Sequence, residues 1–243
     1  MERNEYLKLA EVEDRMWYFR CLHARLRLAV KPAMEAKASA RLLDAGCGTG
    51  GFLLGLKKKE PLWQAEGVDL SSLACEIARS RGVTVQEAAI EKLPYPEKHF
   101  NAIVSGDVLY HIDEPFAALK EFARCLRSGG LVAINVPAYR WLWSYHDDRV
   151  SSKHRFTRDQ VLKLFAAVKL RPVSSTYWNT LPFPLIVLRR KVFPPRDESS
   201  DVKLSSPPVE IALRAAMAAE RGWNRLGLRL PFGSSIFAVA MKE

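Results

Sequence analysis

An acid and three alternating glycines stand together in the run Asp44-Ala45-Gly46-Cys47-Gly48-Thr49-Gly50. Apolar residues precede this run and a new apolar segment follows at 52–56, a pattern that predicts a strand, a tight turn and the start of a helix. Glycines allow positive φ and leave no Cβ between backbone and ligand, and the helix N-terminus presents free N–H groups. The residues therefore predict a site that holds a small polar ligand against bare backbone.

Two kinds of nucleotide ligand fit these residues. The run 46–51 matches the dinucleotide fingerprint G-x-G-x-x-G, and Asp69 follows Gly50 at about the 20 residues expected for an acid that binds ribose hydroxyls. Asp44 separates the two ligands, because a carboxylate at the glycine turn repels pyrophosphate but favours a ligand with ammonium and sulfonium cations. An NAD(P)-binding oxidoreductase stays open as the alternative at this point.

The segments that follow resemble, in the same order, those of the class I S-adenosylmethionine (SAM)-dependent methyltransferases, and in particular the ubiquinone/menaquinone-biosynthesis-like group of methyltransferase domains. That family's first motif, D/E-x-G-x-G-x-G, is matched by 44–50. Further matches are 91–105 for the third and fourth strand region, 107–112 for the segment after strand four, and 126–137 for the turn and fifth strand. The resemblance covers roughly residues 41–137 and implies SAM as the cofactor.

The resemblance also implies which residues hold the cofactor. Asp44 favours the methionyl end, Asp69 accepts from both ribose hydroxyls, and Leu70 flanks the adenine. Ala89 stands where many relatives carry an acid for the adenine amino group, so we expect the backbone near Ile90 to serve there. The remaining cofactor-binding candidates are Gly46, Cys47, Gly48, Gly50, Ser105 and Arg20.

His111 and Tyr18 are the candidate catalytic residues. An imidazole can take a proton near neutral pH, and His111 is expected just past the fourth strand, although a lone histidine can also be structural. In the similar phosphoethanolamine-type methyltransferases a histidine here works with an N-terminal tyrosine, which implies this role for Tyr18. The run 17–20 is similar to a Trp-Trp-Phe-Arg segment whose helix closes over the cofactor, which implies a contact between Arg20 and the SAM carboxylate.

Aromatic residues are dense after the fifth predicted strand. Tyr139, Trp141, Trp143 and His146 are candidates for a substrate wall, and a hydrophobic lid on the sheet is the alternative. The spacing of His146, Asp147 and His154 matches no compact metal site, so no metal is expected. We expect Asp147 and Arg155 instead to fix the loop before Thr157, which is typical of an N-cap for a helix over 158–168.

These residues need a scaffold, and the pattern predicts an α/β fold with a doubly wound, parallel, Rossmann-like sheet of seven strands. The chain has 243 residues, 48% of them hydrophobic, enough for one sizeable core. We expect an N-terminal helical cap over 1–40, in which Pro32 ends the helix, and a methyltransferase domain over 41–243 with a helical insertion over 178–230. The strands are predicted near 41–44, 65–69, 83–88, 101–105, 130–136, 171–177 and 235–241.

Charge and composition bear on partners and compartment. The net charge of +10 is dispersed, and Ser105-Gly106-Asp107-Val108 replaces the Asn/Asp-Pro-Pro-aromatic motif of base-amine methyltransferases, which disfavours a nucleic-acid substrate. The charged N-terminus, the four scattered cysteines and the lack of a membrane-spanning apolar run predict a cytoplasmic protein. The apolar run 182–188, followed by the cations 189–191, predicts either a substrate-covering cap or peripheral contact with the inner membrane surface.

The sequence therefore predicts a SAM-dependent methyltransferase that acts on a small-molecule or lipid-linked acceptor, with an oxygen favoured as the methylated atom. Transfer to nitrogen or carbon is the alternative within this class. The rivals from other classes are the oxidoreductase and a non-catalytic SAM-binding or scaffold protein. The sequence leaves the identity of the acceptor and the oligomeric state open.

Overall fold

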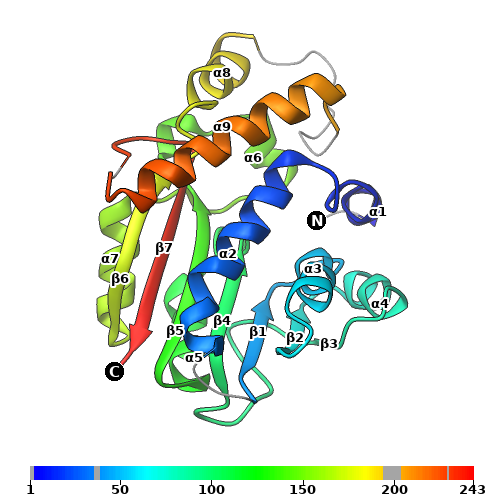
Figure 1. Ribbon diagram of the computed structural model, residues 1–243, viewed down its shortest axis with the longest axis vertical. Helices are drawn as coiled ribbons and strands as arrows, with labels where there is room; N and C mark the ends of the chain where they lie inside the picture. The colour runs from blue at the N-terminus through cyan, green and yellow to red at the C-terminus, as the bar shows by residue number, and fades with distance from the viewer. Residues whose placement is uncertain (1–2, 36–38, 194–203, 229) are drawn as a thin grey trace.

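A seven-stranded sheet forms the centre of the protein in the computed structural model, which describes residues 3–35, 39–193, 204–228 and 230–243 (Figure 1). The strand order is β3-β2-β1-β4-β5-β7-β6. The strands are β1 (Arg41–Ala45), β2 (Gln64–Asp69), β3 (Val85–Glu87), β4 (Phe100–Gly106), β5 (Leu126–Pro137), β6 (Leu170–Trp178) and β7 (Ser235–Lys242). All seven predicted strands and the α/β fold class are thus confirmed.

The direction of β7 corrects the prediction of a wholly parallel sheet. Strands β1 to β5 pair in parallel, but β7 runs antiparallel to both β5 and β6. The physical reason is the connection between β6 and β7. It leaves the sheet and returns to it at the same end of the strands, so that Trp178, the last residue of β6, pairs with Ser235, the first residue of β7. The chain can then only run back along β6, as in any antiparallel pair.

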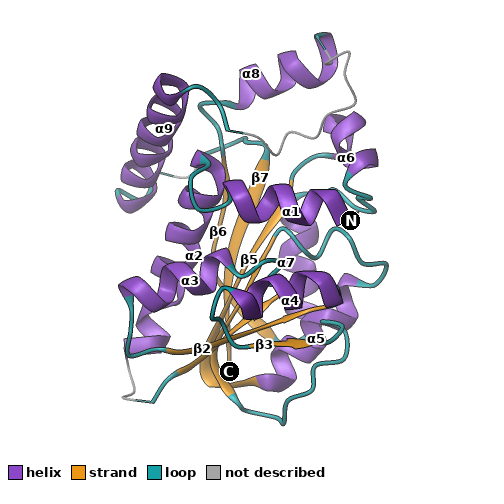
Figure 2. Cartoon of the chain, turned by 90° about the vertical axis from the view of Figure 1, so that its right-hand side faces the viewer, coloured by secondary structure: helices purple, strands orange, loops and turns teal. Residues whose placement is uncertain are grey.

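Helices cover both faces of the sheet. Figure 2 views the sheet nearly edge-on, with α2 (Trp17–Glu35) and α3 (Gly51–Lys59) on one side and α5 (Pro115–Cys125) and α7 (Arg158–Ala167) on the other. Successive strand side chains point to opposite faces, so Leu42 packs in the core beneath α2 and α3, and Leu43 in the core beneath α5 and α7. Two helices lie beside the glycine run, α1 (Arg3–Val12) and α4 (Ser72–Ser80).

The prediction that Pro32 ends the N-terminal helix is wrong, because α2 continues to Glu35 with Pro32 inside it. Proline removes one backbone donor and disturbs the preceding turn, but here the disturbance falls close to the end of the helix. Val30 and Met34, on either side of Pro32, are fully buried in the core with α3 and the sheet. This packing outweighs the local cost.

The predicted insertion between β6 and β7 is helical in its described parts, α8 (Phe183–Val187), the π-helix η2 (Leu188–Val192) and α9 (Pro207–Arg225). Residues 197–203 of its Ser/Pro stretch lie outside the described residues. Side-chain hydrogen bonds close the neck of the insertion, from Asn179 Nδ2 to Ser234 Oγ (3.2 Å) and from Thr180 Oγ1 to the carbonyl of Phe232 (2.5 Å). No helix in the described ranges is both long enough and apolar enough to pass through a membrane.

Candidate active site

The glycine loop joins the end of β1 to the start of α3. The amides of Gly46 and Cys47 both donate to the carbonyl of Val68 at the end of β2, at 2.8 and 2.9 Å. Gly46 has φ +85°, and a Cβ placed there would lie 2.3 Å from Cγ2 of Val108, the second residue after β4. Glycine is therefore required at this position for two reasons, the backbone conformation and the close approach of the segment that follows β4.

Three carboxylates surround this loop. Asp44 is 4% exposed, and burial raises its pKa to about 8, with further contributions from the negative charges of Asp69 and Glu13. Asp69 accepts from the amide of Gly48 (2.8 Å) and from that of Ser71 (2.9 Å), and burial raises its pKa as well. A carboxylate offers about four acceptor positions, so Asp69 retains capacity for further donors. These carboxyl groups suit a cationic ligand, which favours their ionised forms, and they oppose a pyrophosphate.

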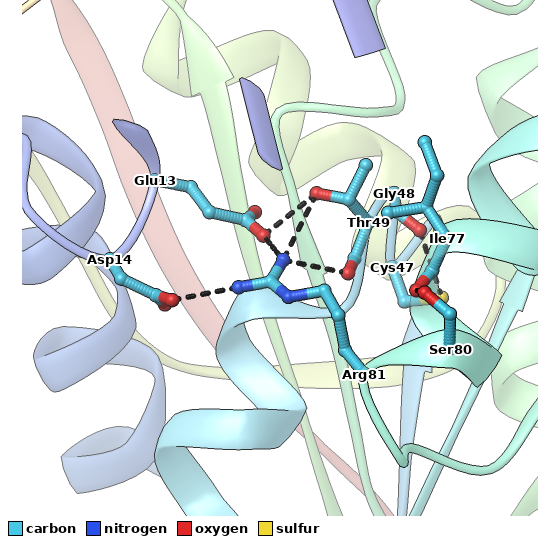
Figure 3. Close-up of polar contacts among 8 residues, drawn as sticks. All are labelled: Glu13, Asp14, Cys47, Gly48, Thr49, Ile77, Ser80 and Arg81. Carbon is cyan, nitrogen blue, oxygen red and sulfur yellow. Dashed lines mark hydrogen bonds and ion pairs between the residues drawn. The ribbon is translucent and has the colours of Figure 1, made fainter. Parts of the chain in front are cut away.

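The segment between α1 and α2 is fastened to the loop by a contact that sequence reasoning missed (Figure 3). Glu13 accepts a hydrogen bond from Thr49 Oγ1 at 2.7 Å and forms an ion pair with Arg81, the residue after α4. The Arg81 guanidinium also donates to the carbonyl of Thr49 (2.9 Å) and to Asp14 (2.7 Å). Burial raises the pKa of Glu13, although its two partners oppose this shift. The only sequence signal was an acidic pair at 13–14.

The other cofactor candidates lie at the same edge of the sheet but differ in exposure. Leu70 is 72% exposed directly after β2, whereas Cys47 and Ile90 are buried. Ser105 is fully buried, and its hydroxyl donates to the carbonyl of Ala45 at 2.9 Å, so it joins β4 to β1 beneath the loop. Arg20 is exposed on α2, and its side chain makes no hydrogen bond or ion pair with any residue that the structure describes.

A buried polar network lies beside the loop, where β4 and β5 end. Tyr18 donates its hydroxyl proton to Asp107 Oδ2 at 2.7 Å, and the Asn135 amide donates to Asp107 Oδ1 at 2.7 Å. The indole of Trp178 donates to Asn135 Oδ1 at 2.5 Å, and its ring stacks on that of Tyr18 with centroids 5.5 Å apart. Side chains of α2 and β5 therefore hold the carboxylate of Asp107 directly, and Trp178 of β6 supports both of them.

Asp107 has two features typical of functional residues. Its φ of 59° places a non-glycine residue in the left-handed region, and burial raises its pKa to about 6 despite the hydrogen bonds from Tyr18 and Asn135. It directly precedes Val108, the residue in contact with Gly46. Sequence reasoning placed Asp107 in the segment after the fourth strand but did not select it. The signal that could have found it is an acid at the carboxyl end of a buried strand.

His111 lies four residues further along the same segment and belongs to a different set of contacts. Its Nδ1 is 3.5 Å from the carbonyl of Ser151, and its ring lies 4.0 Å from that of Tyr110. Burial lowers its pKa to about 4, so its imidazole is neutral at physiological pH. The hydroxyl of Tyr18 bonds to Asp107, and no hydrogen bond joins Tyr18 to His111 in the structure. The pairing of these two residues stays a prediction.

The aromatic candidates after β5 divide into two groups. Tyr139 stacks on Tyr177 of β6 (5.1 Å between centroids) and on Trp141 (5.8 Å). Phe183 of α8 packs against both Tyr139 and Trp141, so these two residues line the base of the insertion. The indole of Trp143 instead donates to Asp148 at 2.8 Å. His146 is partly buried within the short helix α6 (Tyr145–Arg149).

The prediction for Asp147 and Arg155 is confirmed. The guanidinium of Arg155 donates to both carboxylate oxygens of Asp147, at 2.7 and 3.0 Å, and to the carbonyl of Ala138 at 2.8 Å. All three groups are buried. Thr157 caps α7 through a reciprocal pair of hydrogen bonds with Gln160, as an N-cap should. The ion pair thus holds the loop that carries Tyr139 and Trp141 at its start.

Comparisons with known proteins identify the scaffold. A family described as a methyltransferase domain matches residues 16–174. The 2-methyl-6-phytyl-1,4-hydroquinone methyltransferase 2, chloroplastic, of Oryza sativa subsp. japonica is 32% identical over 119 residues, which are 47% of this chain and 34% of that protein. The probable tRNA methyltransferase 9B of Bos taurus is 36% identical over 105 residues, 42% of this chain and 22% of that protein. The matches thus span about a third or less of these relatives.

Solved structures share the fold at low sequence identity. Geranyl diphosphate C-methyltransferase from Streptomyces coelicolor A3(2), in complex with Mg²⁺, geranyl diphosphate and S-adenosyl-L-homocysteine, has a TM-score of 0.62 at 17% identity, covering 90% of this chain and 79% of that one. Phosphoethanolamine N-methyltransferase 2 from Haemonchus contortus, in complex with S-adenosyl-L-methionine, has a TM-score of 0.59 at 19% identity, covering 89% of this chain and 52% of that one.

The residues around the loop fit S-adenosylmethionine. Its sulfonium and ammonium groups are cations, which the ionised carboxylate of Asp44 favours, and its ribose hydroxyls are donors for the free acceptor positions of Asp69. The family match covers more than half of the chain and agrees with both the fold and the charge of the site. The chain therefore belongs to the methyltransferase-domain family of the class I S-adenosylmethionine-dependent methyltransferases.

Proposed function

We propose that the protein transfers the methyl group of S-adenosylmethionine to a hydroxyl oxygen of a small-molecule or lipid-linked acceptor. The observation that carries this proposal is the carboxylate of Asp107, held by Tyr18 and Asn135 next to the glycine loop. A hydroxyl must lose its proton as its oxygen is methylated, and a partly buried carboxylate with a pKa of about 6 can accept that proton near neutral pH. An acceptor that needs no such base would gain nothing from this arrangement.

Bound cofactor supplies the electrophilic methyl group, and the protein supplies position and charge. In this proposal Asp44 and the glycine loop hold the methionyl end, Asp69 holds the ribose, and Leu70 with the backbone at Ile90 holds the adenine. Arg20 is proposed for the cofactor carboxylate. Tyr18 holds the Asp107 carboxylate and in this way orients the acceptor oxygen. His111, whose imidazole is neutral at physiological pH, is the second candidate to accept the proton.

The aromatic residues beside the insertion support an acceptor with a large apolar part. Tyr139 and Trp141 form a stacked surface that Phe183 extends onto α8, and Trp141 is 54% exposed. Aromatic rings bind apolar chains over a large area at low entropic cost. Two similar proteins are named for isoprenoid compounds, a phytyl hydroquinone and geranyl diphosphate. An aromatic or isoprenoid hydroxyl is the acceptor that these observations support.

We propose further that the insertion brings the protein to an anionic membrane surface. Four large apolar side chains of η2 and its neighbours are exposed, Leu185, Leu188, Val192 and Phe193. The same helical segment carries three cations at 189–191, and Figure 1 shows it projecting beyond the sheet. Apolar insertion combined with cations is the arrangement that binds peripheral proteins to acidic lipids. A lipid-linked acceptor would then reach the aromatic surface directly from the bilayer.

The decisive test of O-transfer is a product assay with S-adenosylmethionine labelled in its methyl group. A panel of hydroquinones with free or blocked hydroxyls is offered to the full chain, and the position of the label is read by NMR. We expect label on oxygen, and only with a free hydroxyl. Label on carbon or on an amine would overturn the choice of oxygen while leaving the family assignment intact.

The pH dependence of turnover identifies the proton acceptor. If Asp107 accepts the proton, kcat rises with pH through about 6, whereas acceptance by His111 places the rise near 4. Asp107→Asn should then lower kcat at least about a hundredfold with little change in cofactor affinity. His154→Ala, a change in a partly exposed histidine of another loop, serves as the control. Normal turnover in Asp107→Asn would reject its role as the base.

Membrane contact is tested by co-sedimentation with vesicles of phosphatidylglycerol and of phosphatidylcholine. Phe193→Ser should weaken sedimentation with the acidic vesicles, because it removes an apolar side chain that is 68% exposed. Leu62→Ser is the matched control, since Leu62 is 85% exposed elsewhere on the molecule. Absence of binding to acidic vesicles at physiological salt would exclude this part of the proposal.

A further inference from the structure

A large hollow lies on the face of the sheet that α2 covers, away from the cofactor loop. It is an open groove of about 990 Å³, with β5, β6 and β7 as its floor and α2 and α9 as its walls. Figure 1 shows the reason, since the lower parts of β6 and β7 face the viewer with no helix over them. Phe237, Val239 and Met241 form the apolar floor, and Leu28 and Pro32 belong to the α2 wall.

One cation lies deep in this groove without an acidic partner. The guanidinium carbon of Arg25 is 4.8 Å from the ring centre of Phe237 and 5.6 Å from that of Trp178. Its Nε is buried and has no hydrogen-bond partner, and no acid among the described residues forms an ion pair with it. Glu220 is the acid whose charge acts on it most, but that carboxylate is bonded to the amide of Leu181 at 2.7 Å.

The other charged residues of the groove are also cations. Arg171 and Arg221 also line it, and no aspartate or glutamate does among the residues that the structure describes. Arg171 has a partner, Glu243, at 3.5 Å. The groove thus offers a cation with a buried, unpartnered Nε and an apolar floor, and the described residues that line it include no acid to pair with this cation.

We propose that this groove binds a single-chain apolar molecule with one carboxylate headgroup. The headgroup lies against Arg25, whose guanidinium carbon is 4.8 Å from the ring centre of Phe237 and whose Nε has no partner in the protein. A planar guanidinium with unused N–H donors suits a carboxylate. The apolar chain lies along Pro32, Val239 and Met241, and the volume is of the size that holds one lipid- or drug-sized molecule.

This groove differs from the proposed active site in the residues that line it, although Trp178 of the Asp107 network lies 5.6 Å from the Arg25 guanidinium. No residue that lines the groove is among the cofactor or acceptor candidates. The groove extends along the sheet to Asn101 and Gly130, at the amino-terminal side of β4 and β5, whereas the glycine loop lies at their carboxyl ends. We therefore expect the groove ligand and the cofactor to bind without competing for the same residues.

The test is isothermal titration of the full chain with dodecanoate below its micelle concentration. We expect one dodecanoate per chain, with dodecanol bound at least about tenfold more weakly, because a charge-assisted hydrogen bond is lost. Saturating S-adenosylhomocysteine should leave the dodecanoate affinity unchanged. Absence of binding, equal affinity for dodecanol, or displacement by S-adenosylhomocysteine would each overturn the proposal, the last by locating the chain in the acceptor site.

Variants locate the headgroup. Arg25→Met keeps the aliphatic stem and should lower the affinity for dodecanoate by about tenfold to a hundredfold, with no loss for dodecanol. Lys58→Met removes one exposed positive charge on α3 and is the control for net charge. Val173 lines the groove and is 52% exposed, so Val173→Glu and Val173→Lys are both tolerated by the fold and should shift the affinity in opposite directions. Equal affinities in these two variants would contradict the site.

Discussion

The charge state of Asp44 gives the sharpest prediction for the cofactor site. Burial raises the pKa of this carboxyl to about 8 in the protein without ligand, so about nine tenths of it is protonated at pH 7. A ligand with sulfonium and ammonium cations is stabilised by the ionised form. We therefore expect S-adenosylmethionine to bind more tightly as pH rises, with release of about 0.9 proton per ligand at pH 7.

The magnitude follows from the pKa. If only the ionised form of Asp44 binds the cation, the Kd falls about fiftyfold between pH 6 and pH 8, or about 2.3 kcal/mol. Titration calorimetry in two buffers of different ionisation enthalpy measures both the affinity and the proton release. The α-amino group of the ligand titrates near pH 8, so the profile of Asp44→Asn, in which that group still titrates, is the reference. The difference between the two profiles belongs to Asp44.

Stability of the protein without ligand provides an independent check. The folded-state pKa of Asp44, about 8, exceeds its ordinary value of 3.8, so between these values the folded state holds a proton that the unfolded chain has released. The contribution of Asp44 to stability is therefore complete below about pH 4 and is lost as pH rises through 8. The Tm of the wild type should fall relative to that of Asp44→Asn over this window. A Kd constant within about twofold from pH 6 to 8, without proton release, would refute the reasoning.

Three further substitutions test the packing around the site. Gly46→Ala brings a Cβ to 2.3 Å from Val108, so it should cost more than about 2 kcal/mol by denaturant unfolding, whereas Gly82→Ala, with a similar φ of +81° and open space, shows the backbone cost alone. Arg81→Met leaves Glu13 buried without its cation and should cost about 2–3 kcal/mol. It should also speed hydrogen exchange in α1, and unchanged exchange would rule out the fastening. Arg155→Met should lower the free energy of unfolding by about 3–5 kcal/mol in thermal unfolding, because it leaves Asp147 as a buried charge without its partner. Adding Asp147→Asn should recover part of this loss, and no recovery would show that the ion pair does not matter for stability.

Local sequence patterns were enough to predict much of the fold. The glycine loop, the seven strands and the Thr157 cap follow from residues within a few positions of one another, so one chain is enough to recognise them. The Asp147–Arg155 ion pair spans only eight residues and was also predictable. The continuation of α2 through Pro32 could not be predicted, because it depends on packing in the core. The antiparallel direction of β7 could not be predicted either, because it depends on where a long connection returns to the sheet.

The candidate site was less accessible to sequence reasoning, because its contacts join distant segments. Tyr18 and Asp107 are 89 residues apart, and Asn135 is 117 residues from Tyr18. Strand order brings them together, and no local pattern indicates which acid receives the hydroxyl. The low pKa of His111 has the same origin, since burial is a property of the packed molecule. Residue type therefore predicted which side chains could do chemistry, but the partner of each remained open.

The hydrogen bonds that join the two ends of the insertion suggest how this region could be exchanged between family members. Asn179 and Thr180 are tied to Ser234 and Phe232, and Trp178 is bonded to Asn135 on the sheet side of these contacts. A replacement of residues 181–231 would leave every one of these bonds in the recipient protein. A chimaera must also keep the contacts of α9 with the rest of the fold, since Glu210 accepts from the amide of Trp17 at 2.6 Å and Met217 is buried in the core with residues of α2. A different insertion that keeps these contacts could be grafted onto an unchanged methyl-donor site.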